Sequence, residues 1–586
     1  MKIYLRALSD TFKTIPGYTI LLFIISIFEA ILVPAELNML NKMVESLSKI
    51  QNSDFEMILG YAFLFIAIHI LKIVIGVIRS SLKTISSNKI KYTFYGKLFS
   101  VLSEINLTYF DQSKFNLKIK RSKKAIESIL FEALESFLGI FSTMISLVGI
   151  VVLIIKIDKI YFLIFLIVSI VQNIYSFKIT QENIILDKEQ DDIERRHYYL
   201  FRLLYDHESI REIRDYKLYD WIEEKRTAEF EKIFKKSINF TKKWLKINSI
   251  WSLLMATIEL SFLLCMVIQM HILKLTIAQF VTVYQSYEMF ITNVSSVVNS
   301  FNTLSRYGVI LSELFEVIDM KPKQYKREFI KYNNEEKFIL NNVSFSYDKN
   351  MDVLKKISLV IEKGETVAFV GHNGSGKSTL AKILLHMIEP DKGNIEIPLF
   401  AAHKSSAVFQ DFSRFHFSVF ENVILGNVET IEEEPVQEVI DKVNIALSKS
   451  QCKEFVDRLP QGIDTELGTE YNARGVDISI GQWQRLAIAR SVYRDSEFIV
   501  YDEPTASLDP VAEKKEFDYI KQALRGKTVV LVSHRIGFNK MADKIVFLEE
   551  GEIAECGTHD ELMKRRDKYY RFYNAQAQWY KEDMEI

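Results

Sequence analysis

The chain has 586 residues, more than one compact domain usually holds, with a hydrophobic fraction of 48% and a charged fraction of 25%. Its formal net charge of −1 shows no basic excess, so the composition argues for no nucleic-acid partner. The cysteines have neither metal-ligand nor CxxC spacing, and their scatter suits a reducing cytoplasm: Cys265, Cys452 and Cys556.

Six apolar segments of the N-terminal half are long enough, at roughly 20 residues, to cross a bilayer. They lie at 17–40, 57–79, 130–155, 158–178, 247–270 and 275–304. Lys2 and Arg6 before the first segment resemble the start of a signal peptide. That segment continues to Leu40 without a small-residue cleavage site, which favours a retained membrane helix. We therefore predict a six-helix α-helical transmembrane domain over 1–319.

The polar gaps at 80–129 and 179–246 are long and carry apolar residues at helical spacing. We expect the membrane helices to continue into them as cytoplasmic extensions. Each gap has a break, near Phe110 and near His207, that we interpret as a short crosswise coupling element; a solvated loop is the alternative. By the positive-inside tendency, basic residues place these gaps and both termini in the cytoplasm: Lys89, Lys91, Lys97, Lys118, Lys120, Arg121, Lys123, Lys124, Arg195, Arg196, Lys235 and Lys236.

Several ionisable residues lie within the predicted spans, where each costs about 2.5–3.5 kcal/mol at a helix centre. One hypothesis is that the acidic excess lines a pathway for a cationic or amphipathic cargo. The alternative, which we favour, is pairing between helices, such as Lys72 with a glutamate, or a location near the headgroups. The residues are Glu29, Glu36, His69, Lys72, Glu132, Glu135, Glu259 and Glu288.

After a linker at 320–336, the C-terminal half carries a phosphate-binding loop. The apolar strand Thr366-Val-Ala-Phe-Val leads into the loop, and a helix is predicted from Leu380 to Met387. Glycines allow backbone N–H groups to surround phosphate oxygens, assisted by the helix N-terminus. Lys377 is expected to reach the β- and γ-phosphates and Ser378 to ligate Mg²⁺. The loop residues are Gly371, His372, Asn373, Gly374, Ser375, Gly376, Lys377, Ser378 and Thr379.

A second acidic motif supplies what hydrolysis needs. Phe498-Ile-Val-Tyr-Asp502-Glu503 is an apolar strand that ends in two carboxylates. Asp502 at its tip is expected to hold Mg²⁺ through water, and Glu503 to orient or deprotonate the attacking water. We therefore predict an α/β P-loop ATPase domain over 337–586.

The segment between these motifs, Ile478-Ser-Ile-Gly-Gln-Trp-Gln-Arg-Leu-Ala-Ile-Ala-Arg490, resembles the signature sequence of ABC transporter ATPases. Other elements of that family occur in its order. Phe409-Gln410-Asp411 looks like the Q-loop, Ala506-Ser-Leu-Asp509 like the D-loop, and Ser533-His534-Arg535 like the switch histidine. Six spans followed by an ATPase are also the layout of an exporter-type half-transporter, so the resemblance covers essentially the whole chain.

The resemblance implies further roles. Tyr347 is expected to stack on adenine, His534 to contact the γ-phosphate and Gln410 to reach the metal and the nucleotide. The segment 465–470 is similar to one that contacts membrane-domain loops in exporters. Two ATPase domains meet head to tail in this family, so we expect a dimer with a second half-transporter, an identical chain. The remaining nucleotide contacts implied are Ser479, Gly481, Gln482 and Asp509.

Two departures from the family pattern stand out. Ile480 replaces the first glycine of the signature, and a β-branched side chain restricts backbone approach to phosphate. We therefore predict weakened but retained hydrolysis. The stretch from Gly393 to Gln410 is shorter than most exporters have, which indicates that a strand or turn is missing there.

Within the exporters, Gly481-Gln-Trp-Gln484, Phe409-Gln-Asp-Phe412, Asp509-Pro-Val-Ala-Glu513 and Glu212-Ile-Arg-Asp-Tyr-Lys-Leu218 resemble the nisin-type lantibiotic exporters. The resemblance implies export of a modified, often cationic, peptide across a bacterial cytoplasmic membrane, with membrane lipids and the cargo's biosynthetic enzymes as partners. About 16 residues precede the first span, too few for a leader-cleaving peptidase, so we expect any leader to be removed elsewhere. Export of lipids or hydrophobic drugs stays open. A non-transporting ATP-driven sensor also stays open, although four residues suited to hydrolysis argue against it: Lys377, Asp502, Glu503 and His534.

Overall fold

The computed structural model describes residues 2–48, 55–206, 209–272, 275–320, 330–347, 352–470, 472–502, 526–533, 540 and 542–582. Contacts divide the chain into two compact units. The first unit comprises Met1–Ser103 and Ser113–Met320, and the second comprises Glu104–Gln112 and Lys321–Ile586. Each unit is described by itself below.

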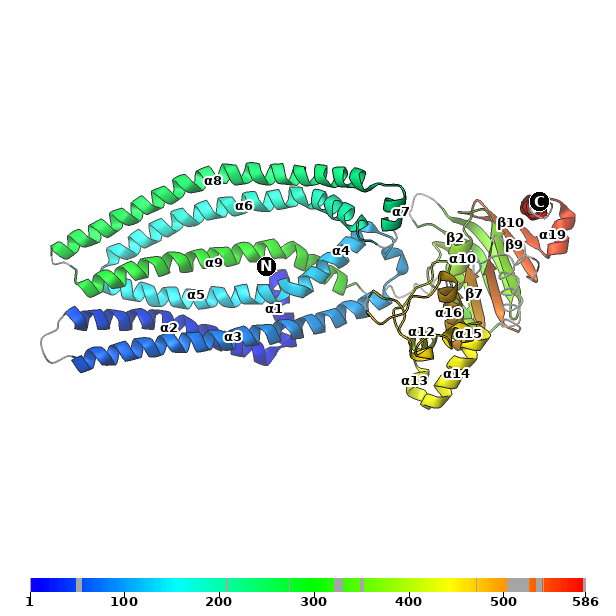
Figure 1. Ribbon diagram of the computed structural model, residues 1–586, viewed down its shortest axis with the longest axis horizontal. Coiled ribbons are helices and arrows are strands. Elements are labelled where there is room, and N and C mark those ends of the chain that lie inside the picture. The colour runs from blue at the N-terminus through cyan, green and yellow to red at the C-terminus, as the bar shows by residue number, and fades with distance from the viewer. Residues whose placement is uncertain are drawn as a thin grey trace. The chain divides into compact units, whose positions relative to one another are not determined.

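The first unit is built from long helices that run alongside one another (Figure 1). Each of the six predicted apolar segments lies within a helix, apart from at most two residues at its start: α2, α3, α5, α6, α8 and α9. A π-helical turn at Ala125–Ile129 joins α4 to α5. The helices are α1 (Lys2–Thr14), α2 (Pro16–Ser48), α3 (Phe55–Glu104), α4 (Ser113–Lys124), α5 (Leu130–Ile157), α6 (Lys159–Leu203), α7 (Ser209–Asp215), α8 (Tyr219–His271) and α9 (Ile277–Ile318).

Within the described residues, five helical stretches are long and apolar enough to cross a membrane, by length and composition. They are Pro16–Ser48, Phe55–Glu104, Ser113–Ile157, Lys159–Leu186 and Tyr219–His271. The predicted sixth segment, 275–304, forms part of α9, but α9 does not meet the same criterion. The predicted count of six is therefore not confirmed. The physical reason is that hydroxyl and amide side chains fill the second half of this segment.

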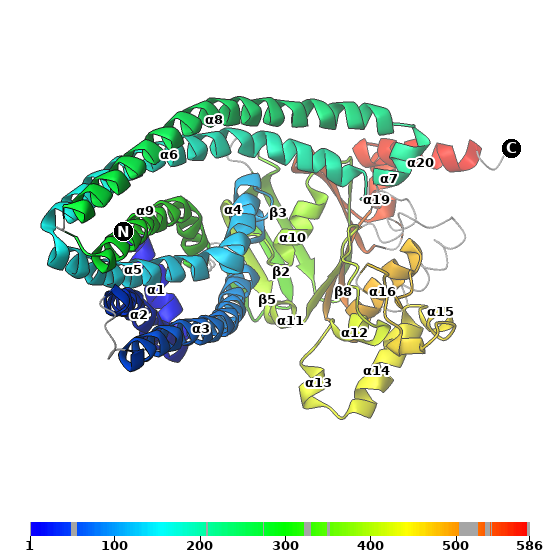
Figure 2. The same cartoon turned by 60° about the vertical axis from the view of Figure 1, so that its left-hand side comes forward.

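The predicted helical extensions are confirmed. α3 continues without a break to Glu104, α6 continues to Leu203, and α8 begins at Tyr219, well before its apolar part. α6 and α8 lie side by side along their length (Figure 2). At the first predicted break a single 3-10 turn, Leu107–Tyr109, precedes α4; at the second, α7 begins at Ser209, and His207 lies outside the described residues.

Aromatic side chains from α6, α8 and α9 form the core of the first unit. The ring of Phe165 lies 5.7 Å from that of Phe262 and 5.2 Å from that of Tyr287. α5 packs between α2 and α9, and its Gly149 allows a close approach to α2. A Cβ on Gly149 would lie 2.5 Å from Cγ of Pro34.

The short helix α1 was not predicted. It packs on α5 and α9, and it is anchored to the end of α9 by an ion pair between Arg6 and Asp319. The guanidinium of Arg6 also lies 4.3 Å from the ring centroid of Phe315. Because the two residues are 313 positions apart, no local sequence pattern predicts this ion pair. Its hydrogen bond to Arg6 lowers the pKa of Asp319.

The second unit contains two sheets. The four-stranded sheet has the order β1-β5-β2-β3 and the six-stranded sheet the order β10-β9-β4-β8-β7-β6. β1 lies within the stretch predicted as a linker, so ordered structure begins before residue 337. The strands are β1 (Ile330–Asn333), β2 (Lys337–Phe345), β3 (Leu354–Glu362), β4 (Thr366–Gly371), β5 (Lys392–Pro398), β6 (Ser405–Val408), β7 (Phe498–Asp502), β8 (Thr528–Val532), β9 (Lys544–Glu549) and β10 (Glu552–Gly557).

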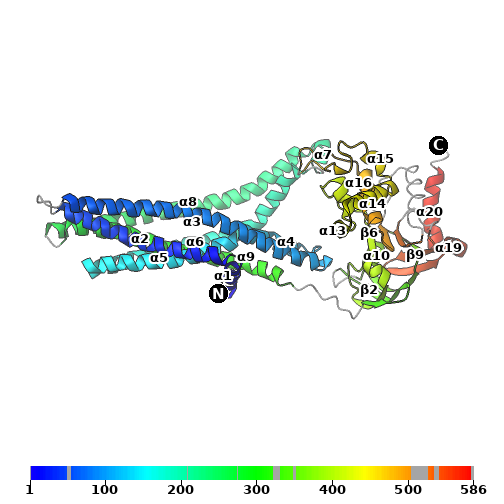
Figure 3. The same ribbon diagram turned by 90° about the horizontal axis from the view of Figure 1, so that it is seen from below.

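Helices cover these sheets. α19 and α20 lie beside the β9–β10 edge (Figure 3), where Tyr569 and Tyr573 pack on Phe547. A separate cluster joins α12, α14 and α16 around Val443, Leu447 and Leu486. The short stretch before Gln410 has α11 between β5 and β6. The described helices are α10 (Lys377–Leu384), α11 (Leu399–His403), α12 (Val419–Ile424), α13 (Thr430–Glu433), α14 (Val436–Lys449), α15 (Lys453–Val456), α16 (Ile480–Tyr493), α19 (His559–Arg565) and α20 (Lys568–Glu582).

Candidate nucleotide-binding site

The candidate site lies at the edge of the six-stranded sheet where four neighbouring parallel strands end. β4, β8, β7 and β6 are adjacent and parallel, so their carboxyl ends meet at this edge. Phe369 of β4 pairs with Val532 of β8, which pairs in turn with Asp502 of β7. Gln410 follows shortly after Val408, the last residue of β6. The register therefore brings the phosphate loop, Asp502 and Gln410 to one edge.

The loop after β4 has the backbone shape that its glycines allow. Gly374 and Gly376 have φ angles of 80° and 97°, in the left-handed region that side chains disfavour. A Cβ on Gly376 would also lie 2.6 Å from Cδ2 of Leu354. Gly376 caps α10, which begins at Lys377 rather than at the predicted Leu380. The loop N–H groups and the helix N-terminus thus lie together, as an anion site requires.

Two buried polar side chains give this loop the chemistry of a phosphate cradle. The ammonium of Lys377, a residue only 6% exposed, donates to the carbonyls of Gly371 at 2.9 Å and His372 at 2.8 Å. The hydroxyl of Ser375 is buried and has no hydrogen-bond partner among the described residues. A buried polar group without a partner costs about 1–3 kcal/mol, which a phosphate oxygen as acceptor would relieve. The loop therefore fits the phosphates of ATP.

Tyr347, the predicted adenine contact, stands just beyond the end of β2. Its ring is 43% exposed and packs edge-on against Phe345, with centroids 4.9 Å apart. Its hydroxyl lies 3.3 Å from the hydroxyl of Thr379 in α10. The ring of Tyr347 thus contacts Phe345, and its hydroxyl contacts Thr379, so the side chain lies next to α10. Stacking on adenine stays a prediction.

The residues predicted to surround Mg²⁺ are oxygen donors at the same edge. Ser378 lies in the first turn of α10. Asp502 is the last residue of β7 and is 6% exposed. Gln410 follows β6. A hydroxyl, a carboxylate and an amide oxygen suit the ligand preference of Mg²⁺ for hard oxygen donors. The residues fit the ion, and their roles as ligands stay predictions.

The signature segment forms the N-terminus of α16. Gln482 N donates to Oγ of Ser479 at 3.3 Å, and Ser479 N donates to Oε1 of Gln482 at 2.8 Å. This reciprocal cap satisfies two N–H groups of the first turn. Ile480 and Gly481 complete that turn, and Ile480 is 53% exposed. Besides their predicted contact with nucleotide, Ser479 and Gln482 therefore set the start of the helix.

Arg490 connects α16 to the stretch after Gln410. In the sequence this arginine was only the last residue of the signature segment. Arg490 donates to the backbone and side-chain oxygens of Asn422 at 3.0 and 2.7 Å, and to the carbonyl of Ser413 at 3.0 Å. It also lies 4.8 Å from the ring centroid of Phe415. Burial lowers the pKa of Arg490 to about 10. Its partner Asn422 is 68 positions away, so no sequence spacing signals the contact.

The segment 465–470, predicted to contact membrane-domain loops, forms backbone hydrogen bonds to two neighbouring stretches of the ATPase domain. Leu467 N donates to the carbonyl of Phe417, and Gly468 N donates to the carbonyl of Val476, each at 3.0 Å. The ring of His416 lies over Gly468, where a Cβ would approach it to 2.9 Å. The segment thus lies between the stretch after Gln410 and the residues before Ser479.

Three predicted site residues lie outside the described residues: Glu503, Asp509 and His534. Glu503 directly follows Asp502, and His534 follows Ser533, which is buried after β8. Their catalytic and nucleotide-binding roles therefore stay predictions.

Most of the ionisable residues predicted within the spans have a partner on a neighbouring helix. Glu36 of α2 bonds to Lys72 and His69 of α3, and this confirms the predicted pairing of Lys72 with a glutamate. Other pairs join Glu29 to Arg79, Glu135 to Lys83, and Glu132 to the hydroxyl of Tyr307. Glu288 accepts from the hydroxyl of Tyr284 at 3.4 Å, with Glu259 near the same tyrosine. Ion pairing leaves Glu29, Glu36 and Glu135 with little net charge to attract a cation.

Comparison with known proteins gives one family match and several relatives. The family model described as ABC transporter matches residues 354–506. The subtilin transport ATP-binding protein SpaT of Bacillus subtilis is 24% identical over 489 residues, 81% of this chain and 78% of that protein. The nisin transport ATP-binding protein NisT of Lactococcus lactis subsp. lactis is 24% identical over 537 residues, 89% of this chain and 88% of that protein.

Two further comparisons extend the picture. An ATP-dependent lipid A-core flippase of Chromohalobacter salexigens is 32% identical over 280 residues, 45% of this chain and 46% of that protein. The solved structure of a bacterial Atm1-family ABC exporter with ATP bound superposes with a TM-score of 0.75 at 20% identity, covering 96% of this chain and 98% of that one. At that identity the likeness concerns the fold: membrane-type helices followed by an ATPase domain.

Proposed function

Because the chain belongs to the ABC transporters, as an exporter-type half-transporter that couples ATP hydrolysis to export, we propose that its cargo is a modified cationic peptide of the lantibiotic or bacteriocin type. One observation carries this proposal. The relatives named for subtilin and nisin transport match over 81% and 89% of the chain, whereas the lipid A-core flippase matches over 45%. Export of a lipid or a hydrophobic drug is the competing function.

The protein is a membrane protein, and we place it in the bacterial cytoplasmic membrane with the ATPase domain and both termini inside. Basic residues on the helical extensions support this orientation, including Lys97 on α3 and Lys236 on α8.

The site needs a second half-transporter, which we propose is an identical chain. The N-terminus of α16 exposes Ile480, and a helix N-terminus of this kind attracts phosphate. In the proposed head-to-tail dimer, Ser479 and Gly481 of one protomer would face a nucleotide held by the phosphate loop of its partner. Each ATP then lies between two chains.

Within each site, different residues of the chain would bind the phosphates, hold the metal ion and activate water. Lys377 would exchange the carbonyls of Gly371 and His372 for β- and γ-phosphate oxygens, and Ser375 would donate its unpartnered hydroxyl to phosphate. Ser378 and Asp502 would hold Mg²⁺, which when bound neutralises phosphate charge. Glu503 would then orient or deprotonate the attacking water, with His534 at the γ-phosphate.

The nucleotide cycle is proposed to drive alternating access. ATP closes the two ATPase domains, and the coupling segments near Phe110 and His207 pass that motion to the membrane helices so that the cavity opens outward. Hydrolysis then resets the dimer.

The test is ATP hydrolysis by the purified chain in lipid nanodiscs, with and without cationic modified peptides. Glu503→Gln serves as the blank. We expect saturable stimulation by such peptides and none by hydrophobic drugs or added lipids. Equal stimulation by unrelated hydrophobic compounds would instead support the drug or lipid exporter, and leave the nisin-type similarity as ancestry.

A further inference from the structure

The C-terminal helix α20 contacts the phosphate loop through one pair of aromatic rings. His372 follows the first glycine of the loop, and its ring centroid lies 5.2 Å from that of Phe572 in α20. The two ring planes are 86° apart, an edge-to-face arrangement that aromatic pairs favour. His372 is otherwise exposed. A helix that lies outside all the nucleotide motifs of the sequence thus touches the loop that is to hold the phosphates.

The position of α20 is fixed by the sheet behind the loop. Tyr569 is fully buried and packs its ring on that of Phe547 in β9, with centroids 6.3 Å apart. The ring of Phe572 lies 5.5 Å from that of the same Phe547. The N–H of Lys568, the first residue of α20, donates to Oε1 of Glu555 in β10 at 2.7 Å. Phe572 is therefore positioned by β9 and β10 rather than by the loop.

The strand that positions Phe572 also borders the entrance of the loop. Phe547 is paired with Val370 in the parallel register of β9 and β4, directly before the loop begins. A Cβ on Gly371 would lie 2.1 Å from the carbonyl oxygen of Leu548, so β9 and the first residue of the loop are in contact. Phe572 thus connects β9 to the second residue of the loop, one position beyond this contact.

The backbone of His372 organises the residues that are to bind phosphate. Its carbonyl accepts from the ammonium of Lys377 at 2.8 Å and from the N–H of Ser375 at 3.2 Å. The neighbouring Gly374 and Gly376 supply left-handed backbone and have no side chain that could hold the loop. Fixing such glycines costs more conformational entropy than fixing other residues. A ring contact that holds His372 therefore orders the loop before a phosphate arrives.

We propose that Phe572 is a positioning residue of the nucleotide site, which holds the phosphate loop in its binding conformation through His372 and so raises the affinity for ATP. The phenyl ring acts on the loop and not on the nucleotide. A preorganised loop loses less freedom when ATP binds, so the contact lowers the KM for ATP. It acts equally before and during bond breaking, so kcat changes little. The inference does not depend on the identity of the cargo.

A role of Phe572 in packing alone predicts a different pattern. If the ring served only to hold α20 against β9, its loss would lower the stability of the ATPase domain. The KM for ATP of the folded protein would then stay unchanged. The ratio of the effects on KM and on kcat therefore distinguishes the two roles.

The experiment measures kcat and KM for ATP with the full-length protein in nanodiscs. Phe572→Ala is expected to raise KM about fivefold, the size of one edge-to-face ring contact, and to leave kcat within about twofold of the wild type. His372→Ala removes the other ring and should give the same rise. The double variant should show no further rise, because each single variant already removes the pair.

Two further variants serve as controls. Phe572→Leu fills most of the volume against Phe547 without a ring, so it should keep the domain folded and still raise KM. Tyr570→Ala removes an aromatic side chain from the same turn of α20, and in the described part of the chain Tyr570 has no ring contact. Its KM should match the wild type. An unchanged KM in Phe572→Leu, or additive rises in the double variant, would overturn the proposal.

A second measurement does not depend on hydrolysis. In a Glu503→Gln background, thermal unfolding is followed as ATP is added, and the concentration for half-maximal stabilisation reports binding. Phe572→Leu should raise that concentration about fivefold, as it does KM. A lower unfolding midpoint with no change in that concentration would assign Phe572 a packing role only.

Discussion

At the scale of single residues, Ile480 has the most direct bearing on catalysis. It occupies the first turn of α16, directly after the Ser479 cap, and its side chain is 53% exposed. Because so much of it is exposed, the isoleucine contributes little to the packing of the ATPase domain. Its Cβ branch is instead expected to restrict the approach of a phosphate to the helix N-terminus.

Replacing Ile480 by glycine is expected to raise ATP hydrolysis. Recovering one hydrogen bond to phosphate, worth about 1 kcal/mol, corresponds to about a fivefold gain in kcat. The measurement is steady-state hydrolysis in nanodiscs. Ile480→Val keeps the β-branch and should show no gain. Hydrolysis that does not rise in Ile480→Gly would count against the steric explanation of this departure from the family pattern.

At the scale of elements, the contact between α2 and α5 is set by a glycine. Pro34 of α2 lies so close to Gly149 of α5 that a Cβ there would fall 2.5 Å from the proline ring. Both partners are rigid, since one is a proline ring and the other a helix backbone. Neither can rotate away from an added methyl group, so the helices themselves have to move apart.

Gly149→Ala is expected to destabilise the membrane domain by about 1–3 kcal/mol, the usual cost of overpacking. Thermal unfolding of the detergent-solubilised protein measures the effect as a lower midpoint. Gly139→Ala is the control on the same helix, because a Cβ there meets nothing within 4 Å. Equal midpoints for the two variants would show that α2 and α5 are not held at this distance.

Other elements show what the sequence can and cannot predict. The phosphate loop was predictable because its strand, glycines and lysine are neighbours in the chain. β4 and β7 coincide with the predicted apolar runs. The start of α10 was misplaced because the helix begins at Lys377, inside the loop motif, with Gly376 as its cap. α1 and the Arg490 contacts depend on partners far away in the chain, which spacing does not reveal.

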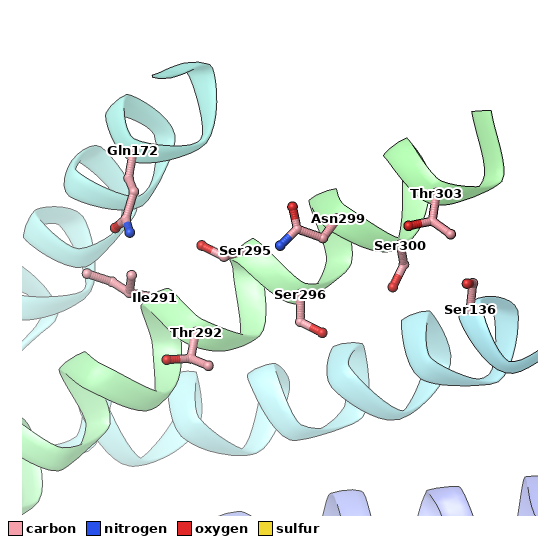
Figure 4. A pocket seen from close by; sticks show the side chains of 9 residues that line it. All are labelled: Ser136, Gln172, Ile291, Thr292, Ser295, Ser296, Asn299, Ser300 and Thr303. Atoms are coloured by element: carbon pink, nitrogen blue, oxygen red, sulfur yellow. The ribbon is translucent and has the colours of Figure 1, made fainter. Parts of the chain in front are cut away.

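The polar face of α9, whose side chains Figure 4 shows, was not predicted, for another reason. The segment 275–304 was predicted as a span from its length, and that criterion does not register the polar residues gathered in its second half. A helical spacing of Thr292, Ser296, Asn299 and Thr303 is the sequence signal that points to one polar face.

At the scale of the whole molecule, the proposed dimer would make hydrolysis a property of a pair of chains. The phosphate loop and the signature helix are built from different parts of the ATPase domain. In the proposed dimer, the loop of one protomer works with Ser479 of its partner. A defect in the loop and a defect in the signature should therefore complement each other when they lie in different chains.

Lys377→Ala and Ser479→Arg are each expected to abolish hydrolysis in a homodimer. Co-expression with two different affinity tags, followed by tandem purification, yields the mixed dimer. That dimer retains one intact composite site and should recover part of the wild-type hydrolysis rate. A mixed dimer as inactive as either parent would argue that the sites do not act separately, and recovery by mixing two Lys377→Ala chains would reveal contamination.

The polarity of α9 also has a consequence for how the protein is made. Among the described residues of the first unit, five helical stretches are long and apolar enough to cross a membrane, by length and composition, and α9 is not one of them. During synthesis it emerges after α2, α5 and α6, whose surfaces it packs against. As a sixth span, α9 would depend for its insertion on helices already in the membrane. Because α9 is the last helix of the first unit, its insertion would decide on which side of the membrane the ATPase domain lies.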